Sequence, residues 1–242
     1  IGVLSAIGDM QNTRTGHFEG LNKIIQQDAI DGGYLDLIES DLNIYGRNTR
    51  PLFVALSYFS DVKLPITNNT NETMAILEEL GIDEPHNRKT LNQLTQEEKG
   101  KLFQKLVEMI SKVVPGKYVK YIPRLIIGDS YTFLKEDEYS FLRDGSEFST
   151  AMNACGRNHE EKVAMEVLKG DRIESLDELE VISKNHRRNL AQAISKVAEA
   201  DETNIIELEN LQYFDGDGIK PEIVGTVISR SEERRVGKEC RS

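Results

Sequence analysis

The chain opens on a short apolar run, IGVLSAIG, that ends at the single carboxylate Asp9. Short apolar runs bounded by turn residues are typical of strands in parallel sheets that are covered on both faces. The pattern predicts a buried strand over residues 1–9. Asp9 would then lie at the carboxyl end of a strand, where open α/β sheets bind ligands, although a helix cap is an alternative role for such a carboxylate.

Helical spacing follows in two segments. The first ends at Gly32-Gly33, and the second, over 51–59, begins with Pro51 at a first-turn position. The positions predicted to share one helix face are Leu21, Ile24, Ile25 and Ala29 in the first segment, and Leu52, Ala55, Leu56 and Phe59 in the second.

Residues from about 60 to 125 are mainly polar with helical periodicity, and we interpret them as a helical insertion. Asn71 is predicted to cap the helix NETMAILEEL, which Gly81 would end. Thr95 and Glu98 have the spacing of a capping box, and Pro115-Gly116 closes the helix that follows. Its predicted apolar stripe is Leu102, Phe103, Leu106, Ile110 and Val113.

The C-terminal part predicts two short helices over 146–169, joined at residues 156–158, and a long charged connector helix over roughly 176–199. HRR (186–188) is expected on the solvated face of that connector. Strands IIELE and LQYF come next, and DGDG (215–218) is interpreted as a hairpin turn, because the further ligands of a calcium loop are missing. A helix opening at Pro221 suggests that a second α/β domain begins here.

Composition narrows the classes of function. The 242 residues carry a net charge of −11, which argues against non-specific coating of nucleic acid, since that binding depends on Lys and Arg neutralising phosphates. Any nucleic-acid contact would need a local basic track or metal ions. No apolar run has the length of a membrane span, so we expect a cytoplasmic protein with no membrane partner, and two cysteines without a CxxC pair exclude a zinc finger.

The last thirteen residues, RSEERRVGKECRS (230–242), have no apolar period. A charged tail is one interpretation, but the string also resembles the translation of a common sequencing adaptor, and we exclude it from fold reasoning as an artefact. The remainder carries 25 basic and 38 acidic residues, a net charge of −13, with Cys155 as its one cysteine. Together with an opening that lacks Met, this predicts a gene fragment cut at both ends.

Several residues are candidates for chemistry. GRNTRP (46–51) places Arg47 and Arg50 before a helix, where guanidinium groups could hold phosphate or could instead form salt bridges across a domain boundary. NACGRN (153–158) places Arg157 after Gly156, which permits close backbone approach. Two-metal sites need several carboxylates and histidines, and no such cluster is visible downstream of Asp9. The histidines are expected at the surface or in turns: His17, His86, His159 and His186.

Three stretches together resemble one family. They are AIGDMQ (6–11), DLNIYGRNTRPL (41–52) with LSYFSDVKLP (56–65), and SEFSTAMNACGR (146–157) leading to VLKGD. Their order and spacing resemble the archaeal-type RecJ-like nucleases of the DHH phosphoesterase superfamily, relatives of the GINS-associated nuclease. The resemblance runs from residue 1 to about 229.

The resemblance implies roles for particular residues. Asp9 would be the metal ligand of the fourth family motif, while the other ligands, in an Asp-x-Asp motif, a further Asp and an Asp-His-His motif, are absent from this chain. Asn153 and Arg157 would line the nucleic-acid path, with Arg157 on phosphate. Cys155 stands where many relatives carry a small residue.

The expected fold is α/β: the C-terminal part of a DHH-type parallel-sheet domain over 1–172 with its helical insertion, a connector helix over 173–202, and the start of a DHHA1-type domain over 203–229. For the parent protein the resemblance implies hydrolysis of single-stranded DNA or RNA with Mn²⁺ or Mg²⁺, in replication or repair, with GINS or the replisome as a possible partner. The fragment itself is expected to be inactive. Two alternatives stay open: a non-catalytic GINS-binding scaffold, and a phosphodiesterase for short oligonucleotides or cyclic dinucleotides.

Overall fold

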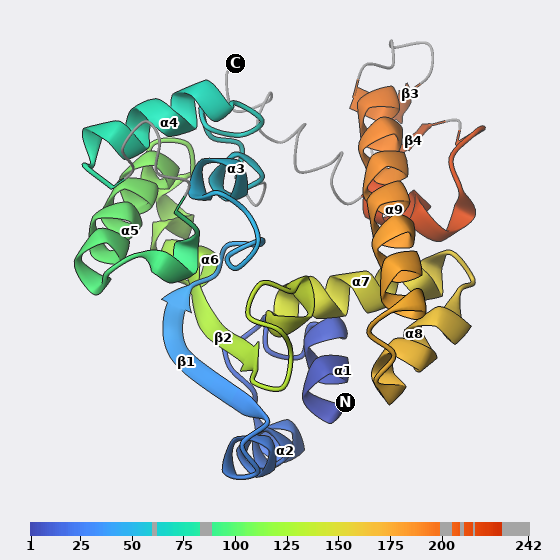
Figure 1. Cartoon of the computed structure of the whole chain (residues 1–242). Helices are drawn as coiled ribbons and strands as arrows, with labels where there is room; N and C mark the ends of the chain where they lie inside the picture. Colours follow the sequence, from blue (N-terminus) through green and yellow to red (C-terminus); the bar gives the residue numbers. More distant parts are fainter. Residues whose placement is uncertain (60–61, 83–88, 199–204, 209–210, 215, 229–242) are drawn as a thin grey trace. The chain divides into compact units, whose positions relative to one another are not determined.

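The computed structural model describes residues 1–59, 62–82, 89–198, 205–208, 211–214 and 216–228 (Figure 1). The chain divides into two compact units within one helix, α7 (Gly145–Arg157): the first unit is Ile1–Thr150 and the second begins at Ala151. The predicted domain limits at residues 172 and 202 stay predictions.

The expected N-terminal strand is a helix, α1 (Gly2–Gly8), and Asp9 is its C-cap. Val3, Leu4 and Ala6 are buried, while Ser5 between them is exposed. A strand would have placed Val3 and Ser5 on the same face, whereas a helix gathers the apolar positions on one side. An apolar run this short does not distinguish the two by periodicity alone, so the strand prediction was wrong for a definable reason.

The sheet of the first unit is an antiparallel pair, β1 (Leu35–Leu42) and β2 (Ile127–Phe133), with Leu35 opposite Phe133 and Leu42 opposite Ile127. The register shifts between Ile38 and Asp41, where Ser40 has a positive φ of 55°. The second pair of strands that the structure describes is also antiparallel. The parallel-sheet part of the predicted fold is therefore not found in the described residues.

A small core holds α1 and α2 (Gly20–Asp31) against this sheet. The Phe18 ring packs on the Tyr131 ring with 5.0 Å between centroids. The predicted helix is confirmed at α2, but its predicted face is only partly right, because Leu21 and Ile24 are exposed while Ile25 is partly buried. The buried members of this core are Val3, Ala6, Phe18, Leu35 and Tyr131.

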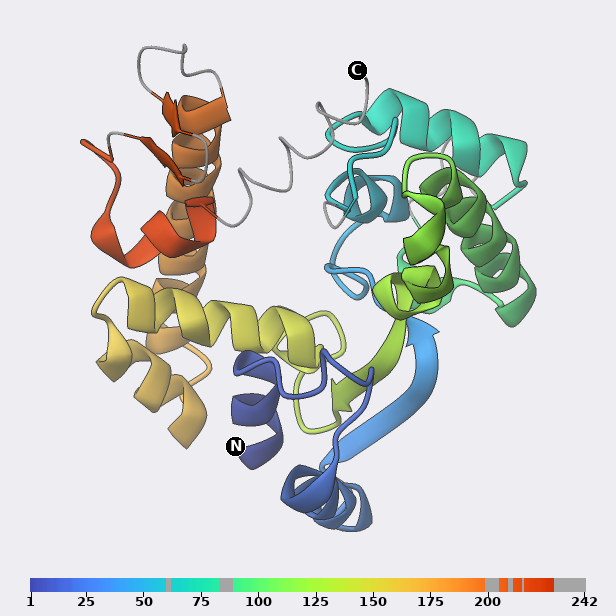
Figure 2. The ribbon, with the colours of Figure 1, turned by 180° about the vertical axis from the view of Figure 1, so that it is seen from behind.

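The predicted helical block is present (Figure 2). It has its own, larger core. This core combines side chains of α3 (Leu52–Ser57), which precedes the block, with those of α4 (Thr70–Glu79), α5 (Gln96–Ser111) and α6 (Ile122–Ile126). Two 3₁₀ turns of the block lie at Leu91–Gln93 and Gly116–Tyr121. A third 3₁₀ turn, Phe141–Arg143, precedes α7.

Local signals set the ends of two helices in this block. The capping box of Thr95 and Glu98 forms as predicted, but Asn69 rather than Asn71 caps α4 by accepting the Glu72 N–H. All four positions predicted for the buried face of α3 and its end are buried: Leu52, Ala55, Leu56 and Phe59.

The second unit contains the end of α7, then α8 (Glu161–Lys169), the long α9 (Glu174–Ala198), a hairpin of β3 (Ile205–Leu208) and β4 (Leu211–Phe214), and a helix over 221–228. The long charged helix predicted over roughly 176–199 is confirmed as α9, while its role as a connector stays a prediction. Residues 216–218 of DGDG connect β4 to the helix over 221–228, so the hairpin-turn interpretation was wrong, and Asp215 lies outside the described residues. Ile194, Val197, Ile223 and Val227 form the core between the two helices.

Candidate functional site

Asp9 is exposed at the C-terminus of α1, and the residue after it, Met10, has a positive φ of 57°. The Asp9 carboxylate accepts a hydrogen bond of 2.7 Å from the Gln11 amide, whose oxygen accepts one of 2.5 Å from Asn22. Because a carboxylate only accepts hydrogen bonds, the Gln11 amide must point its nitrogen toward Asp9 and its oxygen toward Asn22. The carboxylate is thus held in place while it faces solvent.

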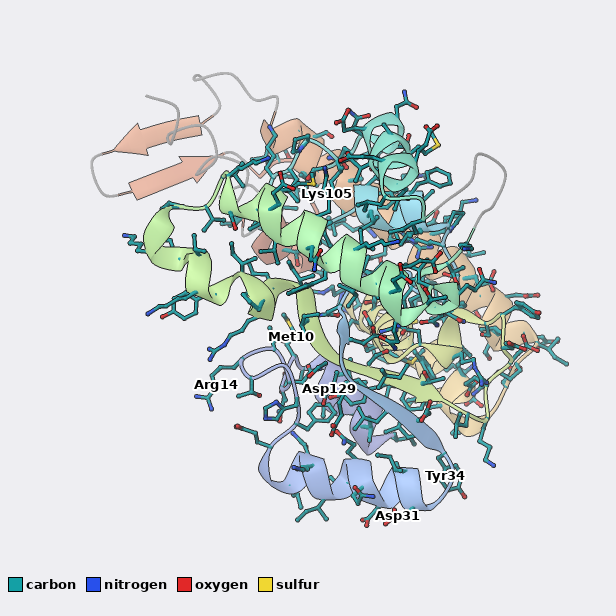
Figure 3. All side chains as sticks on the ribbon, turned by 90° about the vertical axis from the view of Figure 1, so that its left-hand side faces the viewer. Met10, Arg14, Asp31, Tyr34, Lys105 and Asp129 are labelled. Carbon is teal, nitrogen blue, oxygen red and sulfur yellow. The ribbon has the colours of Figure 1, made fainter. Side chains whose placement is uncertain are left out.

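The loop after α1, which carries Met10 and Arg14, is hydrogen-bonded to strand β2 at Asp129; Figure 3 labels the three residues. The Asp129 N–H donates to the Gly16 carbonyl over 2.8 Å, and its carboxylate accepts the Ser40 N–H over 3.2 Å. Burial raises the pKa of Asp129. Tyr131, two residues further on, also has its pKa raised, chiefly by burial and then by the Asp129 charge, and its buried hydroxyl has no hydrogen-bond partner of normal geometry in the described structure.

A metal site cannot be assembled from these residues alone. In the part of the chain that the structure describes, no group of three or more His, Cys, Asp or Glu side chains is placed to hold a metal ion. Asp9 is a chemically suitable oxygen ligand for Mn²⁺ or Mg²⁺, but one carboxylate does not hold a metal pair. The residues present therefore do not fit the two-metal centre that the resemblance implies.

Arg47 is 5% exposed and is paired inside the first unit. Its guanidinium donates to the Asp41 carboxylate and, over 2.7 Å, to Asn92, while the Lys99 ammonium donates to both Asp41 oxygens at 2.9 Å. Burial acts to raise the pKa of Asp41, but the bonds from Lys99 and Arg47 outweigh it and hold that pKa below its ordinary value. Arg47 thus forms a salt bridge, as one of the two predicted alternatives had it. It could bind phosphate only if its buried pair with Asp41 were broken.

The rest of the GRNTRP loop is also bound to its surroundings. Asn48 donates to the Glu138 and Ser140 carbonyls, and the Thr49 hydroxyl donates to Glu147 over 2.5 Å. Arg50 is half-buried, with its guanidinium 5.0 Å from the Tyr45 ring centroid and 4.9 Å from that of Tyr58.

Gly46, at φ 84°, is required at the start of this loop because a Cβ there would collide with the Arg50 side chain. Most polar side chains of the loop are therefore engaged in fixing its position against neighbouring elements.

Two buried carboxyl groups lie where this loop meets α7. Asp144 accepts the Glu147 N–H over 2.9 Å, as an N-cap residue does. Burial raises the pKa of both Asp144 and Glu147, and Arg47 partly offsets the effect on Asp144. One Glu147 oxygen is buried without a hydrogen-bond partner in the described structure.

Asn153 and Arg157 are exposed and lie one turn apart on the C-terminal half of α7, in the second unit. The Arg157 guanidinium donates to the Glu222 carbonyl over 2.7 Å. Cys155, between them, is fully buried, and burial raises the pKa of its thiol to about 11, which makes it a packing residue.

Asp9 belongs to the first unit and Arg157 to the second. Of the histidines, His17 and His159 are exposed as expected, His86 lies outside the described residues, and His186 is half-buried, which corrects its expected place on a solvated face.

With this geometry in hand, comparison with known proteins gives a class. Residues 44–126 match the model of the DHH-CID domain. The match begins just before the GRNTRP loop and runs to the end of α6, so it covers the block predicted as a helical insertion. It supports membership of the DHH superfamily, and with it a phosphoesterase class.

A second comparison gives a particular relative. The chain is 30% identical over 179 residues to the uncharacterized protein MJ1071 of Methanocaldococcus jannaschii. The aligned region is 72% of this chain and 50% of the relative, so the chain spans about half the length of the protein that it matches. In the described residues, no helix is both long and apolar enough to cross a membrane.

Proposed function

We propose that this chain is part of a DHH-type phosphodiesterase that hydrolyses single-stranded nucleic acid with Mn²⁺ or Mg²⁺, acting as an exonuclease in DNA replication or repair. The observation that carries the proposal is the match of residues 44–126 to the DHH-CID domain, in a chain whose Asp9 is exposed and held by Gln11. The finer activity rests on the resemblance of the motifs around Asp9 and Arg157.

In this proposal Asp9 supplies one carboxylate to the metal site of a longer protein. One Asp9 oxygen accepts from Gln11, and the other makes no hydrogen bond in the described structure, so it is open to a ligand. Bound metal ions would supply Lewis-acid chemistry to the phosphodiester. Because the present residues do not form a metal pair, we expect no metal-dependent hydrolysis from the chain by itself.

Asn153 and Arg157 would bind and orient the strand rather than react with it. Both are exposed on one face of α7, and a guanidinium offers several donors in a geometry that suits phosphate oxygens. We do not assign a phosphate to Arg47, because it is buried and paired with Asp41. Arg50 is a weaker candidate than Arg157 for a phosphate contact, because its guanidinium packs on two tyrosine rings.

The test uses a longer protein that contains this chain together with the Asp-x-Asp and Asp-His-His motifs. Asp9→Ala is expected to abolish Mn²⁺-dependent degradation of single strands without changing the melting temperature, whereas Asp28→Ala, an exposed acid on α2, should leave the rate unchanged. Equal activity of Asp9→Ala and wild type would reject the site. A wild-type protein that binds single strands but never degrades them would favour the scaffold alternative instead.

A further inference from the structure

Three cations and one histidine from distant parts of the sequence gather in the second unit. Arg157 comes from the end of α7, His186 and Arg187 from the middle of α9, and Lys220 from the segment before the helix over 221–228. His186 and Lys220 both lie within hydrogen-bond distance of Asn158, the residue after Arg157, and the positive charges of Arg157, Lys220 and Arg187 lower the pKa of the His186 ring. We call these four residues the basic cluster.

Asn158 holds the cluster together and fixes its hydrogen-bonding pattern. The Asn158 oxygen accepts from the Lys220 ammonium over 3.2 Å, and its nitrogen donates to the Ala154 carbonyl over 2.7 Å. Since an ammonium only donates and a carbonyl only accepts, the amide orientation is determined. The same nitrogen, 3.3 Å from His186 Nδ1, must then donate to it, so the neutral ring carries its proton on Nε2.

The His186 ring is therefore a neutral donor placed among cations. Burial lowers its pKa, and the nearby positive charges of Arg157, Lys220 and Arg187 lower it further, so the neutral form dominates at neutral pH. Nε2 has no hydrogen-bond partner in the described structure and is not among the buried atoms that lack one, so solvent reaches it.

The positive charges of the cluster are not neutralised by salt bridges. Among the described residues, none of Arg157, Arg187 and Lys220 has a carboxylate oxygen within 4.0 Å. Glu222 lies beside the cluster: its carboxylate is 3.3 Å from His159 and also interacts with the Lys220 charge, while its backbone carbonyl accepts from Arg157. All three cations are exposed, so a ligand can reach them.

We propose that the basic cluster of Arg157, His186, Arg187 and Lys220 is a binding site for an internal phosphodiester of single-stranded nucleic acid. The three cations would neutralise the phosphate charge, and His186 Nε2–H would donate to one of its oxygens. The assignment rests on the proposed function, which places Arg157 on the strand, and it extends the strand path onto α9. In a chain with a net charge of −11, a local site of this kind is what electrostatic attraction of a polyanion requires.

The experiment measures binding of the full chain to a 3′-labelled oligothymidylate of about 12 nucleotides by fluorescence anisotropy, with EDTA present and salt varied from about 50 to 200 mM. The double variant Arg187→Ala/Lys220→Ala is expected to bind about tenfold more weakly. The slope of log K against log salt should flatten by up to about 0.7, because the cluster contacts one phosphate and each lost phosphate contact on a single strand contributes about 0.7. The matched control is Arg188→Ala, an exposed arginine next to the cluster that does not act on His186.

The neutral donor has a separate signature. His186→Leu is expected to weaken binding by about threefold with no change in the salt slope, because a neutral donor releases no counterions. Lys220→Gln keeps a donor for Asn158 and separates loss of charge from any loss of folding, which far-ultraviolet circular dichroism monitors.

Three outcomes would overturn the assignment. The first is an equal loss of oligothymidylate affinity in the double variant and in Arg188→Ala. The second is that the wild-type chain does not bind the oligonucleotide at the lowest salt. The third is a loss seen only with 5′-phosphorylated strands, which would indicate a terminal phosphate in place of an internal one. Because metal is absent, failure of hydrolysis in the longer protein would leave this result unaffected, so the two proposals fail independently.

Discussion

Arg47 and Arg157 look alike in the sequence, since each follows a glycine and each is a candidate for phosphate, yet the structure gives them opposite surroundings. Arg47 is 5% exposed and shares Asp41 with Lys99. Arg157 is exposed, donates to a backbone carbonyl, and stands with other cations that have no carboxylate oxygen within 4.0 Å among the described residues.

The contrast shows what distinguishes a structural arginine from a candidate binding arginine. A buried cation must be paired, because an uncompensated charge in the interior costs several kcal/mol. An exposed group of like charges repels itself, and an anionic ligand relieves that repulsion. The basic cluster therefore has an electrostatic reason to bind phosphate, and the Asp41 cluster already contains its own anion.

The largest expected effect is a loss of stability when the buried partner of Arg47 is replaced. Asp41→Asn leaves Arg47 and Lys99 without their carboxylate and is expected to lower the free energy of unfolding by about 3–5 kcal/mol at pH 7, measured by urea denaturation. Asp36→Asn, on the exposed side of β1, is the control and should change it by less than about 0.5 kcal/mol.

The same pair predicts a pH dependence. Because the folded-state pKa of Asp41 is lowered, its stabilisation is present above the ordinary value of 3.8 and is lost as the pH falls through the folded pKa. Asp41→Asn should lack this acid-side loss, and an unaltered loss in the variant would assign it to other carboxylates.

A smaller effect compares two arginines as ligands for single strands. Arg157→Ala is expected to weaken oligothymidylate binding about fivefold, or roughly 1 kcal/mol. Arg50→Ala should leave binding within about twofold, although it removes contacts with two tyrosine rings and so lowers stability by about 1 kcal/mol. Equal losses of affinity would show that the GRNTRP loop belongs to the strand path after all.

The smallest expected effect on stability concerns Glu147, whose carboxylate accepts a hydrogen bond from the Thr49 hydroxyl in the GRNTRP loop. Burial raises the pKa of Glu147 in the folded protein, so its carboxyl group deprotonates at a lower pH in the unfolded chain than in the folded one. The free energy of unfolding therefore falls as the pH rises from about 4.5 through the folded pKa. Glu147→Gln should remove this fall and be more stable than wild type by about 1 kcal/mol at pH 7, with no gain at pH 4. Thermal melts across this range, with the exposed Glu138→Gln as control, check it; a gain that persists at pH 4 would contradict the charge explanation.

Helices with strong local signals could be predicted from the sequence. The capping box at Thr95 and Glu98 forms as expected, and α9 is present where charged helical periodicity runs for many turns. The strands of the first unit could not be found this way. β1 contains Asp36, Glu39 and Asp41, and it exists because it pairs with β2 some ninety residues away.

The candidate site likewise contains residues that the sequence identified and residues that only the structure revealed. Motif resemblance selected Asp9, Asn153 and Arg157, and the structure exposes all three, but it does not test their roles. His186 and Lys220 were missed, because nothing near either residue in the sequence shows that they meet at Asn158.

By itself, the sequence determined the helical block at 60–125, the capping box of Thr95 and Glu98, and the resemblance that the DHH-CID match supports. Those features depend on neighbours along the chain. Only the tertiary structure decided that Gly2–Gly8 form a helix, that Arg47 is a buried ion-pair partner, and that four residues from α7, α9 and the segment after β4 form a basic cluster. Burial and charge pairing depend on residues far apart in the sequence, and the fold alone brings those residues together.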